Sequence, residues 1–348
     1  MNKKNNNSQQ VHHQNLQPNE LTGSAKKSML TRIISAIVLI IIVVPSIFLG
    51  DWVYFGLLTF AMGFACFEIL GCAGKRMVFI FIIYFLFVAL IAYWPMFRGI
   101  VLNSANFSKP DLYYLEIRLP ILILVIGIFL LFWLTVIYKD FSVVDASFLI
   151  TMAIIIGFGF QCLFYLRYYP ITRLGFYTPE AWDFNLNNTV VSSVLILFVI
   201  LSAIMTDTGA YFVGVFFGKT KMNERISPKK TWEGFFGGII VSFLVCSAVG
   251  LALAFSGHPI LDVFGPNRWY NVLILSFLTP FFATLGDFVF SAIKRYWGIK
   301  DYGKLIPGHG GVLDRLDSIF FAAIVASIIV FILTQINGGT FNWENILV

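Results

Sequence analysis

Residues 31–49 read TRIISAIVLIIIVVPSIFL, a run that is almost entirely apolar after Arg32. A helix needs about 20 apolar residues to cross the hydrocarbon core of a bilayer. Unpaired backbone groups are costly in lipid, and a run of this length is too long for a barrel strand, so we expect a transmembrane helix. Eight comparable runs follow, at 52–73, 77–96, 119–138, 146–166, 190–217, 233–255, 271–290 and 317–336. The sequence therefore predicts an all-α, polytopic integral membrane bundle of about nine transmembrane helices.

The composition supports this fold class. Of the 348 residues, 58% are apolar and only 12% are charged, and the mean hydropathy is +0.83. Soluble domains carry roughly 25% charged residues, so a soluble enzyme, a disordered protein and a disulfide scaffold are all excluded. The four cysteines lie inside apolar runs without C-x-x-C spacing, and we interpret them as small core residues.

The chain divides into four regions by composition. Residues 1–29 are rich in Asn and Gln and are expected to form a disordered cytoplasmic tail. Residues 30–189 hold the variable N-terminal transmembrane helices, whose first run is interpreted as a signal anchor. Residues 190–336 form the predicted catalytic transmembrane region, and 337–348 a C-terminal tail.

The distribution of Lys and Arg predicts the orientation. With a cytoplasmic N-terminus, 18 of the 24 basic residues fall on the inner side, as the positive-inside rule requires. The C-terminus is then outside. Ten of these cations lie in two inner loops, 218–232 and 291–316. If the protein is bacterial, we expect the inner cell membrane and an active site that faces the cytoplasm.

Three carboxylates stand inside predicted spans, namely Glu68, Asp207 and Asp287. A carboxylate near the bilayer centre costs about 2.5–3.5 kcal/mol on an insertion scale, so such a residue is a candidate functional group. The small residues that follow Asp207 could equally serve close helix packing. Likewise, Thr231 before Glu233 is typical of a helix cap, and the lysines beside it are expected from topology alone.

A second group of polar residues surrounds the end of the eighth span. Asp287, Ser291 and Lys294 share one helical face, and Asp314 and Asp317 lie on one side of the ninth helix. The glycines around His309 allow the backbone to approach an oxygen-rich ligand closely. Mg²⁺ binds one or two carboxylates together with phosphate oxygens, and cations balance the remaining charge. The pattern predicts a site for a magnesium-bound polyphosphate.

The residues from Ser291 to Asp317 also carry a family resemblance. They read S-x-I-K-R-x₄-K-D-x-G-x₂-I-P-x-H-G-G-V-x-D-R-L-D. This run resembles the signature of phosphatidate cytidylyltransferases without a mismatch, and the similarity extends over roughly residues 190–336. The resemblance implies a Mg²⁺-dependent enzyme of phospholipid biosynthesis, a nucleotidyltransferase that converts CTP and phosphatidic acid into CDP-diacylglycerol and pyrophosphate.

The resemblance also implies roles for individual residues. Asp287 and Asp314 would bind the metal, and a second cation is an open alternative. The catalytic candidates are Asp287, Asp314, Lys294, Arg295 and Asp317. The substrate-binding candidates are Ser227, Lys229, Lys230, Thr231, Asp207, Ser291, Lys300, Asp301, His309, Gly310, Gly311, Arg315 and Glu68. The expected partners are CTP, phosphatidic acid and the lipid bilayer, with a homodimer as one possible assembly and no nucleic acid.

Two other functions share these features. In a cation-coupled transporter the intramembrane acids would bind the coupling ion, but the sequence lacks the internal repeats of many transporters. A lipid kinase that uses CTP or ATP shares the electrostatics and differs in the phosphorus that is attacked. The acids cluster with the inner cations, which favours the nucleotidyltransferase.

Overall fold

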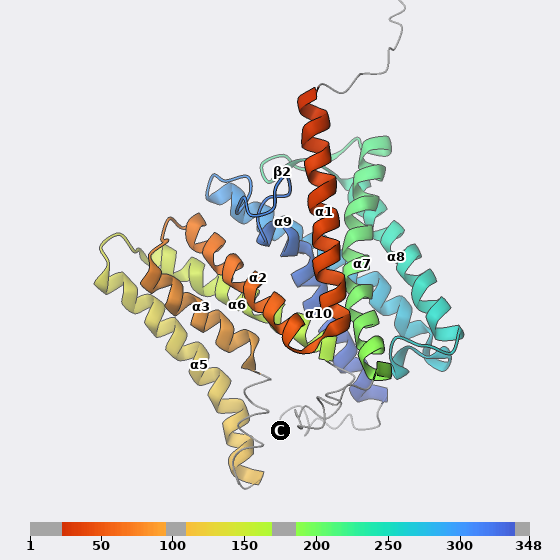
Figure 1. Ribbon diagram of the computed structural model, residues 1–348, viewed down its shortest axis with the longest axis horizontal. Coiled ribbons are helices and arrows are strands. Elements are labelled where there is room, and N and C mark those ends of the chain that lie inside the picture. The colour runs from red at the N-terminus through yellow and green to blue at the C-terminus, as the bar shows by residue number, and fades with distance from the viewer. Residues whose placement is uncertain (1–22, 95–108, 169–185, 338–348) are drawn as a thin grey trace, which may run out of the picture.

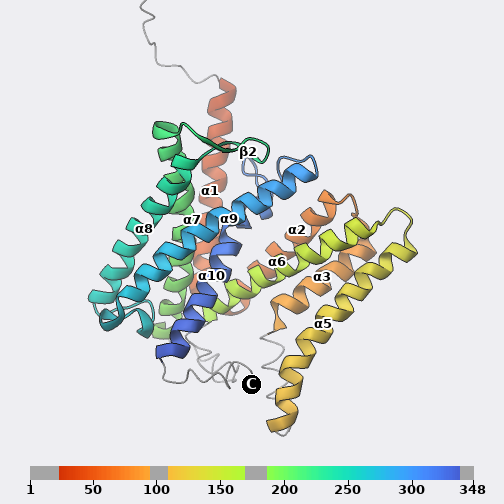
Figure 2. The same ribbon diagram turned by 180° about the vertical axis from the view of Figure 1, so that it is seen from behind.

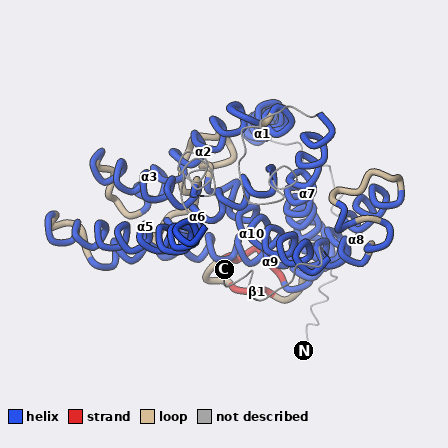
Figure 3. The backbone as a smooth tube through the Cα atoms, turned by 90° about the horizontal axis from the view of Figure 1, so that it is seen from below, coloured by secondary structure: helices blue, strands red, loops and turns tan. Residues whose placement is uncertain are grey.

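The computed structural model describes residues 23–94, 109–168 and 186–337. Helices make up nearly all of this part of the chain, and the strands form only one short hairpin (Figure 3). The helices in chain order are α1 (Gly23–Leu49), α2 (Asp51–Cys72), α3 (Val78–Ala92), α5 (Lys109–Ile137), α6 (Val143–Tyr168), α7 (Leu186–Phe217), α8 (Trp232–Phe255), α9 (Tyr270–Tyr296) and α10 (Leu313–Asn337). The hairpin consists of β1 (Lys221–Asn223) and β2 (Ser227–Thr231).

Each of the nine predicted spans overlaps one of these helices. Within the described ranges, eight helices are long and apolar enough to cross a membrane, and α3 is shorter at 15 residues. Many large apolar side chains on these helices are exposed, for example Ile41, Phe129 and Trp133. Such a surface suits lipid and not water, so the protein is a multi-pass membrane protein with an all-α fold.

Several predicted boundaries are wrong: α1 begins at Gly23, inside the predicted disordered tail, and α3 ends at Ala92, before the predicted residue 96. The predicted span at 119–138 leaves residues 109–118 outside the helix, but α5 already begins at Lys109. Pro120 lies inside this helix, because the tertiary structure tolerates a proline within a transmembrane helix. Most of the predicted tail at 1–29, parts of the outer loops (95–108 and 169–185) and the C-terminal residues 338–348 lie outside the described residues.

The helices form two groups that meet at α10. Helices α2, α3, α5 and α6 lie together on one side, and α1, α7, α8 and α9 on the other (Figures 1 and 2). Helix α10 contacts α6, α7 and α9. The central position of α10 brings its N-terminal acids next to residues from both groups.

Small and hydroxylated residues pack α7 against its neighbours. A Cβ atom on Gly209 would lie 2.8 Å from Cβ of Val241 on α8, and one on Gly238 would lie 2.6 Å from the carbonyl oxygen of Thr206. Ser202 of α7 also hydrogen-bonds Thr279 of α9 at 2.9 Å. Both features are typical of helix association in lipid, so packing accounts for Gly209, one of the glycines that follow Asp207.

The polar segments gather at one end of the bundle. The start of α1, the β1–β2 hairpin and the segment between α9 and α10 all lie at the top of Figure 1. These are the segments that the Lys and Arg distribution assigned to a single side. Their common location is consistent with that assignment.

Candidate active site

Lys230 and Asp287 form an ion pair between the hairpin and α9. In β2 Lys230 is half-buried while Lys229 is exposed. The ammonium group of Lys230 also lies 4.3 Å from the ring centre of Phe288, and Ser291 Oγ donates to Asp287 Oδ1 at 3.3 Å. The shared face predicted for Asp287 and Ser291 is confirmed.

Lys294 joins two acids of α10. Its Nζ lies 3.0 Å from Asp314 Oδ1 and 3.8 Å from Asp317 Oδ2. All three residues are buried. Removing one member of a buried ion pair typically costs about 3–5 kcal/mol, because the partner keeps an uncompensated charge. Lys294 therefore balances negative charge of Asp314 and Asp317 at the N-terminal end of α10.

The acids of three helices lie close together. Asp317 of α10 is near enough to Asp287 of α9 and Asp207 of α7 for their charges to repel. Asp207 is also within electrostatic reach of Lys230 and Arg315. We call Asp207, Asp287, Asp314 and Asp317 the acid cluster. Since like charges in a poorly solvated site repel strongly, this arrangement favours cations.

The glycine-rich loop before α10 wraps around Asp314. Its Oδ2 accepts hydrogen bonds from the backbone nitrogens of Tyr302 at 2.8 Å and Gly311 at 2.9 Å. Gly310 has a φ of +88°, and a Cβ atom there would lie 2.8 Å from Asp314 Oδ2. The glycine at position 310 thus makes room for a carboxylate oxygen of the chain itself, that of Asp314.

Glu68 of α2 holds the start of α10. Its Oε1 accepts from the backbone nitrogen of Val312 and its Oε2 from that of Leu313, both at 2.9 Å. These nitrogens belong to the free N–H groups of a helix N-terminus, which attract negative charge. The structure therefore gives this intramembrane acid a structural partner that the sequence did not indicate.

His309 contacts the first helix. Its Nδ1 lies 2.7 Å from Ser35 Oγ of α1, and Arg32 of α1 packs beside Gly308. Burial and the nearby charges of Arg315 and Arg32 lower the pKa of His309, which favours the neutral imidazole. No sequence signal pointed to Ser35, because the two residues are 274 positions apart.

Several predicted site residues lie away from the acid cluster. Arg295 donates to the backbone oxygens of Ile226 at 3.2 Å and Ile299 at 3.0 Å. Thr231 caps α8 by accepting from Gly234 N, which confirms the capping interpretation. Lys229 is exposed, Ser227 is half-buried in β2, and Lys300 and Asp301 line a cavity beside α2.

The acid cluster offers carboxylate oxygens, which are the type of ligand that Mg²⁺ binds. Within the described residues, no three His, Cys, Asp or Glu side chains are arranged to hold a metal ion by themselves. Mg²⁺ commonly uses only one or two protein carboxylates and completes its shell with phosphate oxygens and water. Asp287 and Asp314 are carboxylates of this kind, since both oxygens of Asp287 and one oxygen of Asp314 pair only with side chains.

Comparison with known proteins gives the family. The model of a family described as "Cytidylyltransferase family" matches residues 30–333. The chain belongs to this family. It is 30% identical to the phosphatidate cytidylyltransferase of Bacillus subtilis over 302 residues, which are 85% of this chain and 94% of that protein. Membership of the family agrees with the signature between Ser291 and Asp317.

Other relatives match over a shorter region. The chain is 35% identical to the phosphatidate cytidylyltransferase of Staphylococcus saprophyticus over 202 residues, which are 58% of this chain and 65% of that protein. The chain is also 41% identical to the phosphatidate cytidylyltransferase of Mycobacterium leprae over 128 residues, which are 37% of this chain and 38% of that protein. The matched region thus spans less than two thirds of the staphylococcal relative, whose family the chain shares.

Proposed function

We propose that the protein is a phosphatidate cytidylyltransferase, which converts CTP and phosphatidic acid into CDP-diacylglycerol and pyrophosphate. The observation that carries the proposal is the acid cluster, in which carboxylates from α7, α9 and α10 lie beside Lys230 and Lys294. Family membership supports it. The relatives named for this activity match 58% and 85% of the chain.

The proposed reaction is an attack of the lipid phosphate on the α-phosphorus of CTP. A new P–O bond forms at the α-phosphorus, the bond to the β-phosphate breaks, and pyrophosphate leaves. A phosphate monoester is largely ionised near pH 7, so little help from a general base is needed. Positioning and neutralisation of charge then dominate the barrier.

Three cations are candidates to neutralise that charge. Lys230 and Lys294 pair with Asp287 and Asp314 in the described structure, and the exposed Arg315 interacts electrostatically with Asp207. An incoming triphosphate would compete for these cations. We propose that they bind phosphate oxygens of CTP and of the lipid. Lys229 and Arg295 are weaker candidates, because Lys229 is exposed and Arg295 donates to the backbone of Ile226.

We further propose that Asp287 and Asp314 hold Mg²⁺. Mg²⁺ would neutralise the triphosphate and polarise the phosphorus that is attacked. Asp317 would contribute negative charge beside it, and Lys294 would keep Asp314 and Asp317 together. A second cation near Asp207 is compatible with the repulsion between these acids.

The polar end of the bundle would face the cytoplasm, where CTP is found. This orientation rests on the 18 basic residues of the predicted inner segments. In a bacterium the location would be the inner cell membrane. The substrates would reach the acid cluster from two phases, CTP from water and phosphatidic acid from the bilayer. A homodimer stays a prediction.

A product assay tests the proposal. Purified protein in detergent receives CTP, Mg²⁺ and phosphatidic acid, and the released nucleotide and phosphate products are identified. The proposed reaction releases pyrophosphate and no CDP. Release of CDP would instead identify a lipid kinase, and an absence of any CTP consumption in a correctly folded sample would remove the enzymatic function.

A further inference from the structure

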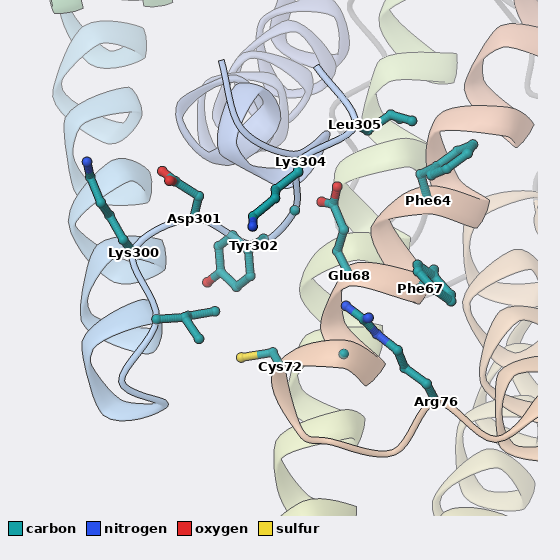
Figure 4. A pocket seen from close by; sticks show the side chains of 13 residues that line it. Phe64, Phe67, Glu68, Cys72, Arg76, Lys300, Asp301, Tyr302, Lys304 and Leu305 are labelled. Atoms are coloured by element: carbon teal, nitrogen blue, oxygen red, sulfur yellow. The ribbon is translucent and has the colours of Figure 1, made fainter. Parts of the chain in front are cut away.

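A cavity of about 710 Å³ lies between the C-terminal end of α2 and the segment 299–305. Its volume falls within the roughly 300–1,000 Å³ of typical small-molecule sites. Phe64 and Phe67 of α2 line one wall, and Lys304 and Leu305 of the segment line another (Figure 4). The cavity thus combines apolar and basic side chains.

Two side chains separate this cavity from the acid cluster. The Tyr302 hydroxyl donates to the backbone oxygen of Phe290 at 3.0 Å, and its ring lies 5.4 Å from Lys294 Nζ. Glu68 binds the backbone of the loop before α10. Both residues line the cavity and both are buried, at 4% and 3% exposure. A ligand in the cavity would therefore not contact Asp287.

Arg76 and Lys304 are the cations directed into the cavity. Figure 4 shows them approaching the same space from opposite sides. The Arg76 guanidinium lies 4.7 Å from the ring centre of Phe67, and the absence of a side chain at Gly71 gives it room. Across the described ranges neither cation has a carboxylate within ion-pair distance. Both are available for an anion.

The acids that line the cavity do not cancel these charges. Glu68 lies within electrostatic reach of Arg76, but both of its oxygens already accept from backbone nitrogens. Asp301 and Lys300 lie together on the α9 side of the segment, and both point away from the space between Arg76 and Lys304 in Figure 4. The lining therefore holds three cations and two acids, which leaves a net positive charge.

The position along α2 places the cavity at the edge of the membrane. The candidate span runs from Trp52 to Cys72, so Phe64 and Phe67 stand within its last turns and Arg76 lies just beyond it. Phospholipids present acyl chains to the span and phosphates to its edge, where Lys and Arg side chains gather. The order of apolar and basic residues matches a phospholipid.

We propose that this cavity binds the phosphate headgroup of an anionic phospholipid between Arg76 and Lys304, outside the acid cluster. The acyl chains would leave along Phe64 and Phe67. Because the backbone nitrogen of Tyr302 donates to Asp314, a lipid that holds the segment 299–305 would also hold that carboxylate. The source of the phosphate is either a bulk anionic lipid or phosphatidic acid.

Native mass spectrometry of delipidated protein in detergent tests the proposal without CTP, so its outcome does not depend on the proposed reaction. The probes are dioctanoyl phosphatidylglycerol, phosphatidic acid and phosphatidylcholine. We expect at least one anionic lipid to bind the wild type at least tenfold more tightly than phosphatidylcholine. Arg76→Gln/Lys304→Gln should weaken that binding at least tenfold, and Lys139→Gln, which removes an exposed cation that does not line the cavity, should not.

Each outcome is decisive. Unchanged affinity in the double variant, or equal affinity for phosphatidylcholine, overturns the proposal. Lys304→Gln alone, an exposed position, repeats the test with a smaller loss if the double variant unfolds at a lower temperature. Two supporting outcomes distinguish the occupants. A raised KM for phosphatidic acid in the double variant identifies the bound lipid as the substrate. An unchanged KM, together with phosphatidylglycerol binding by the wild type, identifies a bulk anionic lipid.

Discussion

The carboxylate of Glu68, on the second helix, lies 2.9 Å from the backbone nitrogen of Leu313 at the start of the last helix. The two residues are 245 positions apart. The contact ties α2 to α10, the helix that holds Asp314 and Asp317. An intramembrane acid therefore contributes here by fixing the position of other acids.

Glu68→Ala should lower the stability of the protein. Hydrogen bonds to charged groups contribute about 1.5–3 kcal/mol each, so we expect a loss of about 3 kcal/mol. Glu68→Gln keeps one acceptor and should lose less. Thermal unfolding in detergent measures both variants. Equal Tm values for the wild type and Glu68→Ala would show that the contact does not stabilise α10.

Gly311→Ala should disturb the same contact from the opposite side. A Cβ atom at this position would lie 2.3 Å from Glu68 Oε1, a distance that requires the carboxylate to move. The control is Gly56→Ala on α2, where a Cβ meets no atom within 4 Å and where alanine favours the helix. We expect a lower Tm for the first and an equal or higher Tm for the second. A similar response of both variants would contradict the close approach.

Lys294→Met should destabilise the protein by about 3–5 kcal/mol, because it leaves Asp314 and Asp317 without their shared cation. It should also raise the CTP concentration required for turnover. The double variant Lys294→Met/Asp317→Asn should regain part of the stability, since it removes one of the repelling charges. If the double variant regains no stability and the CTP kinetics are unchanged, Lys294 neither balances these acids nor binds CTP, and it serves only the membrane topology.

The stability should depend on His309 between neutral and mildly acidic pH. The pKa of His309 is lowered by burial and by Arg315 and Arg32, whereas the unfolded chain titrates near 6.5. As the pH falls below about 6.5, the unfolded state takes up a proton first, so this residue lowers stability. His309→Gln should therefore show a smaller fall in Tm from pH 7.5 to 5.5. A fall equal to that of the wild type would exclude this contribution.

Asp287→Asn and Asp314→Asn should each reduce turnover at least 100-fold, since loss of a group that stabilises charge in a transition state costs this much or more. Both variants should still insert and fold, as judged by size-exclusion chromatography and Tm. Asp140→Asn is the matched control, because Asp140 is an exposed acid in the turn before α6. Near wild-type turnover in either of the first two variants would remove the two-carboxylate metal site.

The sequence predicted the helices and the shared face of Asp287 and Ser291, for physical reasons. Apolar runs of about 20 residues are visible without tertiary information. Helical spacing alone placed Asp287 and Ser291 on one face, and the hydrogen bond from Ser291 Oγ to Asp287 Oδ1 agrees with it. The same reasoning overestimated α3 and placed the start of α5 too late. Residues 109–118 carry polar side chains, so their hydropathy does not distinguish a helix from a loop.

Contacts between distant segments could not be predicted. Nothing in the sequence around Glu68 indicates Leu313, and nothing around Ser35 indicates His309, because such pairs depend on how helices pack. The glycines beside His309 were expected to approach a ligand, but Gly310 and Gly311 lie closest to Asp314 and Glu68. A sequence pattern gives the type of residue and its local face, and the fold decides which partner it meets.

The most direct test of the proposed function follows the phosphorus of CTP. Purified protein in detergent receives Mg²⁺, phosphatidic acid and CTP labelled at either the α- or the γ-phosphorus, and the lipid is then extracted. The account predicts that the α-label enters the lipid as CDP-diacylglycerol, that the γ-label stays in water as pyrophosphate, and that Asp287→Asn abolishes the transfer. Transfer of the γ-label to the lipid, or no transfer of either label by folded protein, would contradict it.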